Sequence, residues 1–316
     1  MSIPDISIVV PVYKEEDNIR PFLARTEEVL QNMGLEYEII FCLDPSPDAT
    51  ETVIRTQAAG NSRIKMIKFS RRFGQPVATM AGISHCAGNS CLVIDVDMQD
   101  PPELIEDLYA KLQEGYDVVY AKRRQRKGES WIKLLVSHVG YRFINAISDV
   151  EIPQDTGDFR IMSRRVVDHL KQLGEQNCFL RGLVAFVGFK QTFLEYDRVE
   201  RFKGKGNYNR YLGSLKIGVN GIVSFSNILL SMTSLVGILT VLISLAIICF
   251  IVITKLFFNY PYPLGTPTII VLILFIGGIQ ILSIGFLGEY IGRIYDEVKR
   301  RPRYIIGDTL NMGKVN

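Results

Sequence analysis

The stretch CLVIDVDMQDPPEL, residues 91–104, decides the predicted fold of this protein. Its four apolar residues, Cys91 to Ile94, form the short run that is typical of a buried strand, and the run stops at Asp95. Pro101 and Pro102 then open a segment that we predict to be helical up to Glu114, because proline is favoured in the first turn of a helix. A strand followed by a helix is the unit of parallel α/β sheets.

The same strand-then-helix unit recurs on the N-terminal side of this stretch, and a fifth strand follows it. Apolar runs predict the strands, and apolar residues at helical spacing predict the helices. The predicted strands are 6–12, 37–43, 64–69, 91–94 and 117–121, and the predicted helices are 15–33, 48–58, 76–85 and 101–114. This alternation predicts an α/β fold with a doubly wound, mainly parallel sheet.

In such sheets ligands bind beyond the carboxyl ends of the strands. The segments that follow the first four strands are 13–15, 44–46, 70–72 and 95–97, and three of the four carry carboxylates. Asp95 and Asp97 are spaced so that both can reach one hard divalent cation together with phosphate oxygens. For this pair alone, a solvated acidic turn is the alternative. None of the four segments is a glycine-rich phosphate loop, so a dinucleotide site has no support.

The C-terminal part of the chain is strongly apolar. No charged residue occurs between Ile217 and Thr254, or between Leu256 and Gly288. About 20 apolar residues in a helix cross the hydrocarbon core of a bilayer. We therefore predict two transmembrane helices at 229–253 and 268–287, with two buried helices of a soluble bundle as the alternative.

Basic residues on both flanks predict the topology. Between the two spans, Lys255 is the only charged residue, and a turn-rich loop follows it at residues 259–265. The basic residues that flank the pair are Arg198, Arg201, Lys203, Lys205, Arg210 and Lys216 before the first span and Arg293, Lys299, Arg300, Arg301 and Arg303 after the second. The N-terminus does not resemble a signal peptide, and the five cysteines form no paired framework. We expect a multi-pass protein of the inner (plasma) membrane, with the catalytic domain and both termini cytoplasmic.

A basic run at 122–127 precedes an amphipathic segment at 130–148, which predicts an interfacial helix on the membrane surface; a core-packing helix is the alternative. The predicted organisation is a cytoplasmic domain over 1–212, a juxtamembrane amphipathic helix over 213–228, a transmembrane hairpin over 229–288 and a basic cytoplasmic tail over 289–316.

Three strings together resemble one family: SIVVPVYKEEDN at 7–18, DVDMQDPPE at 95–103 and TGDFR at 156–160. They are similar to the polyprenyl-phosphate glycosyltransferases of the inverting GT-A family 2, a group that includes bactoprenol glucosyltransferases and dolichol-phosphate mannose synthases. The likeness continues through GGIQ at 277–280 and LGEYIGR at 287–293. The resemblance implies a GT-A fold and transfer of a sugar from a nucleotide-sugar to undecaprenyl phosphate. Glucose from UDP-glucose is the preferred prediction for the sugar, and mannose, N-acetylhexosamine and aminoarabinose are the alternatives.

The resemblance also implies roles for individual residues. The residues implied in nucleotide-sugar binding are Pro11, Tyr13, Glu15, Asp44, Arg71, Gly74, Asp95 and Gln99. Asp95 and Asp97 would bind Mg²⁺ or Mn²⁺, and the residues implied in catalysis are Asp95, Asp97, Asp158 and Arg160. The residues implied in binding the acceptor phosphate are Arg123, Lys133, Ser137, Arg198 and Arg201. The chain departs from the family pattern at Leu43, Pro45, Arg72 and Asn207, which leaves the base and the sugar open.

Expected partners are the membrane, a second copy of the chain, a downstream flippase and a second glycosyltransferase, and not nucleic acid. A processive polysaccharide synthase would need a Gln-x-x-Arg-Trp segment, whereas the only tryptophan, Trp131, follows Gly-Glu-Ser. A non-enzymatic nucleotide-binding module would lack the metal carboxylates, and both are present. A transporter would need charged groups inside the spans.

Overall fold

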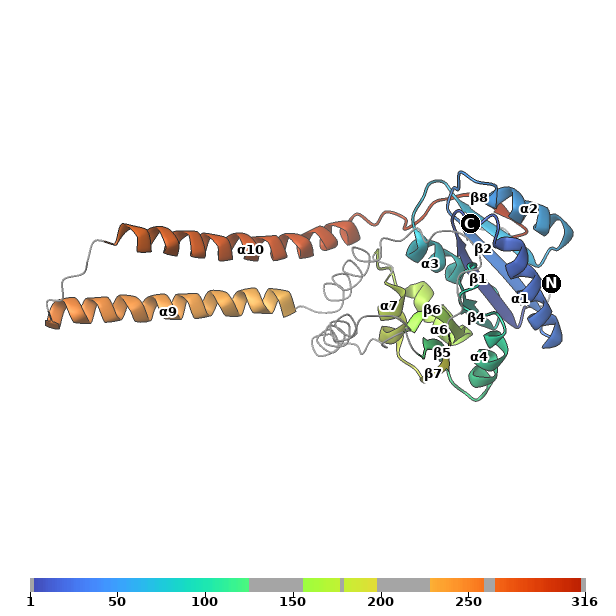
Figure 1. Ribbon diagram of the computed structural model, residues 1–316, viewed down its shortest axis with the longest axis horizontal. Helices are drawn as coiled ribbons and strands as arrows, with labels where there is room; N and C mark the ends of the chain where they lie inside the picture. The colour runs from blue at the N-terminus through green and yellow to red at the C-terminus, as the bar shows by residue number, and fades with distance from the viewer. Residues whose placement is uncertain (1–2, 125–155, 177–178, 198–227, 259–264, 314–316) are drawn as a thin grey trace. The chain divides into compact units, whose positions relative to one another are not determined.

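A computed structural model describes residues 3–124, 156–176, 179–197, 228–258 and 265–313. The predicted interfacial helix at 130–148, nearly all of the juxtamembrane helix at 213–228, and the candidates Lys133, Ser137, Arg198 and Arg201 lie outside these ranges. The described residues form two units, one with residues up to 197 and from 302 onward, the other with residues 228–301 (Figure 1).

The first unit is built on an eight-stranded mixed sheet in the order β7-β5-β6-β4-β1-β2-β3-β8. Strands β1 to β4 pair in parallel, as predicted, whereas β6 runs antiparallel between β4 and β5 and β8 runs antiparallel to β3. The strands are β1 Ile6–Val12, β2 Tyr37–Leu43, β3 Ile64–Phe69, β4 Ser90–Val93, β5 Val118–Arg123, β6 Thr156–Ser163, β7 Gln191–Tyr196 and β8 Ile306–Leu310.

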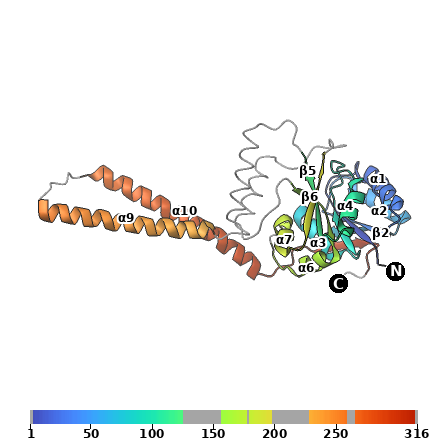
Figure 2. The ribbon, with the colours of Figure 1, turned by 90° about the horizontal axis from the view of Figure 1, so that it is seen from below.

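Helices cover both faces of this sheet. Figure 2 shows α1, α2 and α4 on one side and α3, α6 and α7 on the other. Their bounds are α1 Ile19–Asn32, α2 Thr50–Gly60, α3 Gln75–His85, α4 Leu104–Gln113, α6 Arg164–Gln172 and α7 Leu180–Val187. Since both faces are covered, every residue of β1 and β2 is buried. This explains why these strands read as continuous apolar runs.

Helix α2 begins two residues later than predicted, at Thr50, and α1 and α4 begin three or more residues later. Helix α1 begins at Ile19, because residues 15–18 form a turn in which the Asn18 N–H donates to the Glu15 carbonyl at 3.0 Å. Helix α4 begins at Leu104, after Pro101 and Pro102, which lie in the preceding turn. In both cases the extra loop residues are the ones that follow a strand of the sheet.

The C-terminal end of the chain belongs to the first unit. The sequence analysis treated residues 289–316 as one basic tail, but a helix continues to Val298 and residues 306–310 form β8. Strand β8 pairs with β3, with Ile67 opposite Thr309 and Lys68 opposite Asp308. The short apolar pattern of this strand is weak by itself, and the free edge of β3 provides its hydrogen bonds.

The second unit contains two long helices, α9 Ile228–Phe258 and α10 Thr266–Val298. Both cover the predicted spans and extend beyond them. Within the described residues, the stretch 275–298 of α10 is long and apolar enough to cross a membrane, with a mean hydropathy of 1.4. This is a statement of length and composition, so two membrane crossings stay a prediction.

Candidate active site

The strand register brings most of the predicted site residues to one edge of the sheet. The parallel strands β1, β2 and β4 end at this edge, so the residues after them, including Tyr13, Asp44 and Asp95, lie there. Strand β6 begins at the same edge because Val93 of β4 pairs with Arg160 of β6 in antiparallel register. Two residues beyond that pair, Asp95 follows the end of β4 and Asp158 lies near the start of β6, so both are at the same edge.

Asp95 and Asp97 both lie in the loop after β4. The Asp97 side chain is buried, and its Oδ1 accepts the Gln99 N–H at 3.2 Å. The Asp95 Oδ1 accepts the Gln75 side-chain amide at 2.9 Å. Directly after Asp97, Met98 has a left-handed backbone with φ of 60°, a conformation that non-glycine residues adopt mainly where a turn requires it.

Asp44 holds the loop that follows β3, residues 70–75, which we call the 70–75 loop. Its two carboxylate oxygens accept the N–H groups of Phe73 and Gly74, each at 2.9 Å, and the carboxylate is almost fully buried. Gly74 has a φ of 93°, which favours glycine, and it immediately precedes α3. In this structure Asp44 therefore anchors a loop, and its predicted contact with the base or ribose is untested.

Other predicted nucleotide-sugar residues lie at or after the end of β1, and Arg71 lies in the 70–75 loop. Pro11 is buried in β1, and the Arg72 guanidinium lies 3.9 Å from the centre of the Tyr13 ring. The Arg71 guanidinium lies 4.0 Å from the centre of the Phe73 ring. The Glu15 N–H donates to Thr50 Oγ1 at 3.0 Å, and the Glu15 carboxylate accepts the Asn18 side-chain amide.

Asp158 lies between two arginines. The Arg181 Nε donates to Asp158 Oδ1 at 3.2 Å, and Arg160 Nη2 lies 3.5 Å from the same oxygen. Burial by itself would raise the pKa of Asp158, but Arg181, Arg160 and Arg123 outweigh it and hold that pKa below the ordinary aspartate value. The carboxylate is therefore ionised near neutral pH and is a poor proton acceptor.

Arg160 does not reach the surface of the site. Its side chain is fully buried, Nη2 donates to the Gly157 carbonyl at 2.8 Å, and the guanidinium lies 5.0 Å from the centre of the Tyr120 ring. Burial lowers the pKa of Arg160 despite the nearby Asp158. Arg160, to which the resemblance gives a catalytic role, therefore lies next to Asp158 inside the fold and not on the surface of the site, because residue 160 is central in β6.

Arg123 belongs to a second charged group at the end of β5. Its Nη2 lies 4.0 Å from Asp100 Oδ1, and its Nε donates to the Tyr196 hydroxyl at 3.4 Å. The Tyr196 hydroxyl in turn donates to Asp100. Burial and the Asp100 charge raise the pKa of Tyr196, which keeps the phenol neutral. A Cβ on Gly157 would lie 3.2 Å from Arg123 Nη2, so glycine leaves room for this side chain.

The sequence analysis missed four residues at this edge: Gln75, Asp100, Arg181 and Tyr196. Asp100 lies inside the quoted string 95–103, so its place after β4 could have identified it. Arg181 follows a poorly patterned stretch, and it reaches Asp158 from α7, a helix that packs against α6. Together, Arg123, Arg160 and Arg181 provide three positive charges against Asp100 and Asp158, an excess that can balance a phosphate anion.

The donor set at this edge fits a hard divalent ion. Mg²⁺ and Mn²⁺ prefer carboxylate oxygens, and Mg²⁺ is commonly held by one or two of them plus phosphate oxygens. Asp95 and Asp97 provide two carboxylates in one loop. Within the described residues there is no group of three acidic, histidine or cysteine side chains that could hold a metal alone.

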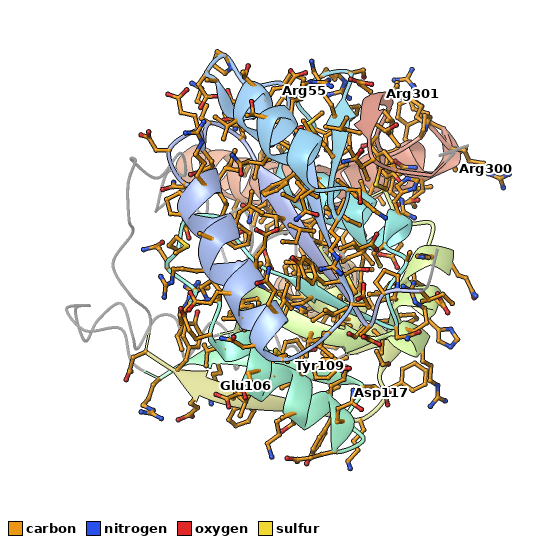
Figure 3. All side chains as sticks on the ribbon, turned by 90° about the vertical axis from the view of Figure 1, so that its right-hand side faces the viewer. Arg55, Glu106, Tyr109, Asp117, Arg300 and Arg301 are labelled. Carbon is orange, nitrogen blue, oxygen red and sulfur yellow. The ribbon has the colours of Figure 1, made fainter. Side chains whose placement is uncertain are left out.

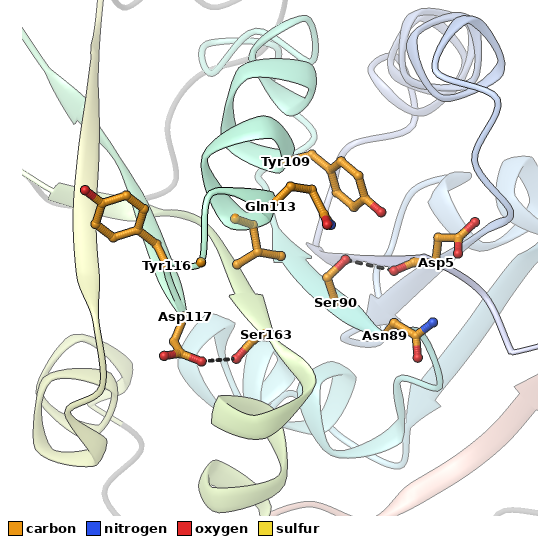
Figure 4. Close-up of a pocket in the computed structure, with 10 residues that line it drawn as sticks. Asp5, Asn89, Ser90, Tyr109, Gln113, Tyr116, Asp117 and Ser163 are labelled. Carbon is orange, nitrogen blue, oxygen red and sulfur yellow. Dashed lines mark hydrogen bonds between the residues drawn. The ribbon is translucent and has the colours of Figure 1, made fainter.

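A pocket of about 320 Å³ lies at the opposite end of the sheet (Figure 4). Its walls come from residues that precede β1, β4 and β5, among them Asp5, Asn89 and Asp117, and from Tyr109 and Gln113 of α4. Since parallel α/β sheets bind ligands at the carboxyl ends of their strands, this pocket is not the candidate site.

Comparison with known proteins gives one family. The model described as glycosyl transferase family 2 matches residues 7–171. An uncharacterised glycosyltransferase of Synechocystis sp. is 43% identical over 96% of this chain and 95% of its own length. An SfII prophage-derived bactoprenol glucosyl transferase of Shigella flexneri is 40% identical over 95% of this chain and 97% of its own length.

Solved structures give a weaker likeness. A mannosyltransferase of Pyrobaculum calidifontis, solved with GDP-mannose and Mn²⁺, is 16% identical over 65% of this chain and 59% of its own, with a TM-score of 0.46. A glucosyl-3-phosphoglycerate synthase of Mycobacterium tuberculosis, solved with Mn²⁺, UDP-glucose and phosphoglyceric acid, is 21% identical over 70% of this chain and 78% of its own, with a TM-score of 0.44.

Proposed function

Since the chain belongs to glycosyl transferase family 2 and is a glycosyltransferase, we propose that it transfers glucose from UDP-glucose to polyprenyl phosphate at the cytoplasmic face of a membrane. The observation that carries the proposal is the 40% identity with a bactoprenol glucosyl transferase over 95% of this chain. The arginine-rich group around Asp158, at the same edge as Asp95 and Asp97, supports it.

The proposed acceptor needs no strong base. A polyprenyl phosphate oxygen is already an anion, so it attacks C1 of the sugar as the bond from C1 to the nucleoside diphosphate breaks, with inversion at C1. The lowered pKa of Asp158 agrees with this, because an ionised carboxylate paired with Arg181 orients groups rather than taking a proton. Catalysis then depends on placing the two substrates and balancing the charge of the leaving diphosphate.

The two ends of the candidate site have different chemistry. Asp95 and Asp97 would hold Mg²⁺ or Mn²⁺, which supplies positive charge to the diphosphate when bound. Tyr13, Asp44 and the 70–75 loop form the proposed nucleotide end. Arg123 and Arg181 form the proposed acceptor end, where the excess of arginines favours a phosphate.

Strand β8 supports the predicted hairpin topology. The chain leaves the first unit before α9 and rejoins the sheet of that unit through β8, after α10. This return favours the proposed arrangement, in which both helices span the membrane and both ends of the helical pair lie on the same side of it, in agreement with the basic flanks.

The test is transfer of radiolabelled sugar to undecaprenyl phosphate by the full chain, with UDP-glucose, GDP-mannose and UDP-N-acetylglucosamine compared as donors in Mg²⁺ and in Mn²⁺. We expect a lipid product from UDP-glucose, and about a hundredfold or greater loss in Asp97→Asn. Asp107→Asn, which changes an exposed carboxylate on α4, is the matched control.

Three results would count against the proposal. Label from another donor in the lipid would contradict glucose as the sugar. Label only in water-soluble products would contradict the lipid acceptor. Near-normal turnover of Asp97→Asn would contradict its metal role.

A further inference from the structure

The segment that links α10 to β8 contacts the 70–75 loop from outside. The Ile305 carbonyl accepts the Ser70 N–H at 2.9 Å, and the Tyr304 ring lies 5.8 Å from the Phe69 ring, centre to centre. The Tyr304 hydroxyl shares a hydrogen bond with Nε2 of His85 at 3.0 Å. Because His85 is the last residue of α3, Tyr304 contacts both the strand that precedes the loop and the helix that follows it.

The same loop contacts two predicted donor-site carboxylates from inside. The Phe69 ring packs edge-on against Phe73 at 6.0 Å, and the N–H groups of Phe73 and Gly74 bind Asp44. Gln75, one residue further, binds Asp95. An unbroken series of contacts therefore runs from Tyr304 through Phe69 and the 70–75 loop to Asp44 and Asp95.

We propose that Tyr304 is a positioning residue for the nucleotide-sugar site: by packing on Phe69 and bonding His85, it holds the 70–75 loop in the conformation that anchors Asp44. Its effect on substrate rests on the proposed function. The physical reason is pre-organisation, since a loop that is already ordered costs less to order when the ligand binds. The C-terminal segment after α10 is thus part of the donor site without touching substrate.

Amide hydrogen exchange on the full chain, in detergent and without substrate, tests the contact itself. Tyr304→Ala should raise the exchange rate of the Phe73 and Gly74 amides about tenfold, because an aromatic pair of this kind contributes about one factor of ten in an equilibrium constant. Tyr304→Phe keeps the ring and loses the hydroxyl, so a smaller increase is expected. Amides of β1 and β2 should keep their protection, which shows that the fold is intact.

Donor kinetics test the consequence. We expect Tyr304→Ala to raise KM for the nucleotide-sugar about tenfold, with KM for the lipid and kcat nearly unchanged. Asp308→Asn is the control on the same segment: it removes the ion pair with Arg55 of α2, at the outer edge of the sheet (Figure 3), and should leave the donor KM unchanged.

The two measurements separate the possible failures. Unchanged exchange at Phe73 and Gly74 in Tyr304→Ala would overturn the proposal, whatever sugar and lipid the enzyme uses. A donor KM that shifts equally in Tyr304→Ala and Asp308→Asn would also overturn it, because the segment would then act only on overall stability. Failure of the unmodified chain to transfer glucose would contradict the proposed function, and the exchange result would still decide the role of Tyr304.

Discussion

Asp158 illustrates how neighbouring charges define the role of one residue. Its carboxylate is 31% exposed and lies 3.2 Å from the Arg181 Nε, with Arg160 behind it. An aspartate in this setting remains ionised, so it can orient a substrate or hold Arg181, but it does not readily take a proton. Of the two arginines beside Asp158, Arg160 is fully buried and Arg181 is partly exposed, so Arg181 is the one that can meet an incoming phosphate.

We predict that Arg181→Ala raises KM for polyprenyl phosphate roughly tenfold to a hundredfold, because a charge-assisted hydrogen bond contributes about 1.5–3 kcal/mol. Arg181→Lys should recover part of the loss. Loss of Arg181 also removes a cause that lowers the pKa of Asp158, so the acid limb of the activity profile should move to higher pH.

Arg165→Ala on α6, an exposed arginine that stacks on Phe189, is the control for Arg181. It should change neither the lipid KM nor the pH profile. An increase in donor KM instead of lipid KM in Arg181→Ala would assign Arg181 to the nucleotide end of the site.

Glu38 is a buried carboxylate that links strands at the end of the sheet opposite the candidate site. Its Oε1 accepts the Ala87 N–H at 2.6 Å and the Ser7 hydroxyl, and its Oε2 binds Lys65. Burial would raise its pKa, but Lys65, Ser7 and Ala87 together lower it. The group therefore links β1, β2, β3 and the turn before β4.

Glu38→Gln should lower the free energy of unfolding by about 1–3 kcal/mol at pH 7, as expected when a buried charged partner is lost. A carboxylate with a lowered folded pKa stabilises above its unfolded pKa and loses that contribution as pH falls through the folded pKa. The difference in the free energy of unfolding between the unmodified protein and Glu38→Gln should thus shrink below about pH 4. Denaturant unfolding at pH 7 and at pH 3 measures this difference. Glu36→Gln, which changes an exposed acid paired with Arg63, is the control and should show little change in the free energy of unfolding. An equal deficit at pH 7 and pH 3 would exclude the charge as the cause.

At the scale of elements, α3 lies unusually close to the sheet. A Cβ on Gly82 would lie 2.3 Å from Val9 Cγ1 and 2.7 Å from Cys42 Sγ, so only glycine fits between this helix and β1 and β2. This close packing places the N-terminal end of α3, and with it Gly74 and Gln75, beside Asp44 and Asp95.

Gly82→Ala should destabilise the protein by about 1–3 kcal/mol, because overpacking outweighs the gain of roughly 1 kcal/mol in helix propensity. Adding Val9→Ala should recover part of the loss by making room for the new methyl group. Gly60→Ala, at the end of α2 with nothing within 4 Å of the added carbon, is the control. Thermal unfolding of the four proteins checks the prediction, and a neutral Gly82→Ala would show that α3 can shift away from the sheet.

For the whole molecule, the return of β8 to the sheet constrains the topology. Because β8 pairs with β3, the C-terminal end of the chain must lie in the same compartment as the first unit. We predict that a reporter after Asn316 is cytoplasmic and that a tag within 259–265 is labelled by an impermeant reagent from outside intact cells. Protection of that tag until the membrane is broken would contradict a transmembrane hairpin.

The sequence by itself determined the four parallel strands, the acidic pair after β4 and the apolar C-terminal helices. Each of these depends on local pattern: a short, mostly apolar run, a strand end, or more than thirty residues without charge. Family resemblance added Asp158, which local pattern does not mark. These features also predicted correctly that the chain is a glycosyltransferase.

Only the tertiary structure decided which residues meet. Arg181 reaches Asp158 from α7, Arg160 is buried, and Tyr304 packs on Phe69, just before the 70–75 loop, from more than two hundred residues away in sequence. Strand β8 was not predicted, because a five-residue strand at a sheet edge takes its stability from the partner strand β3 rather than from its own pattern. Contacts between segments distant in sequence depend on packing and register, which no local pattern encodes.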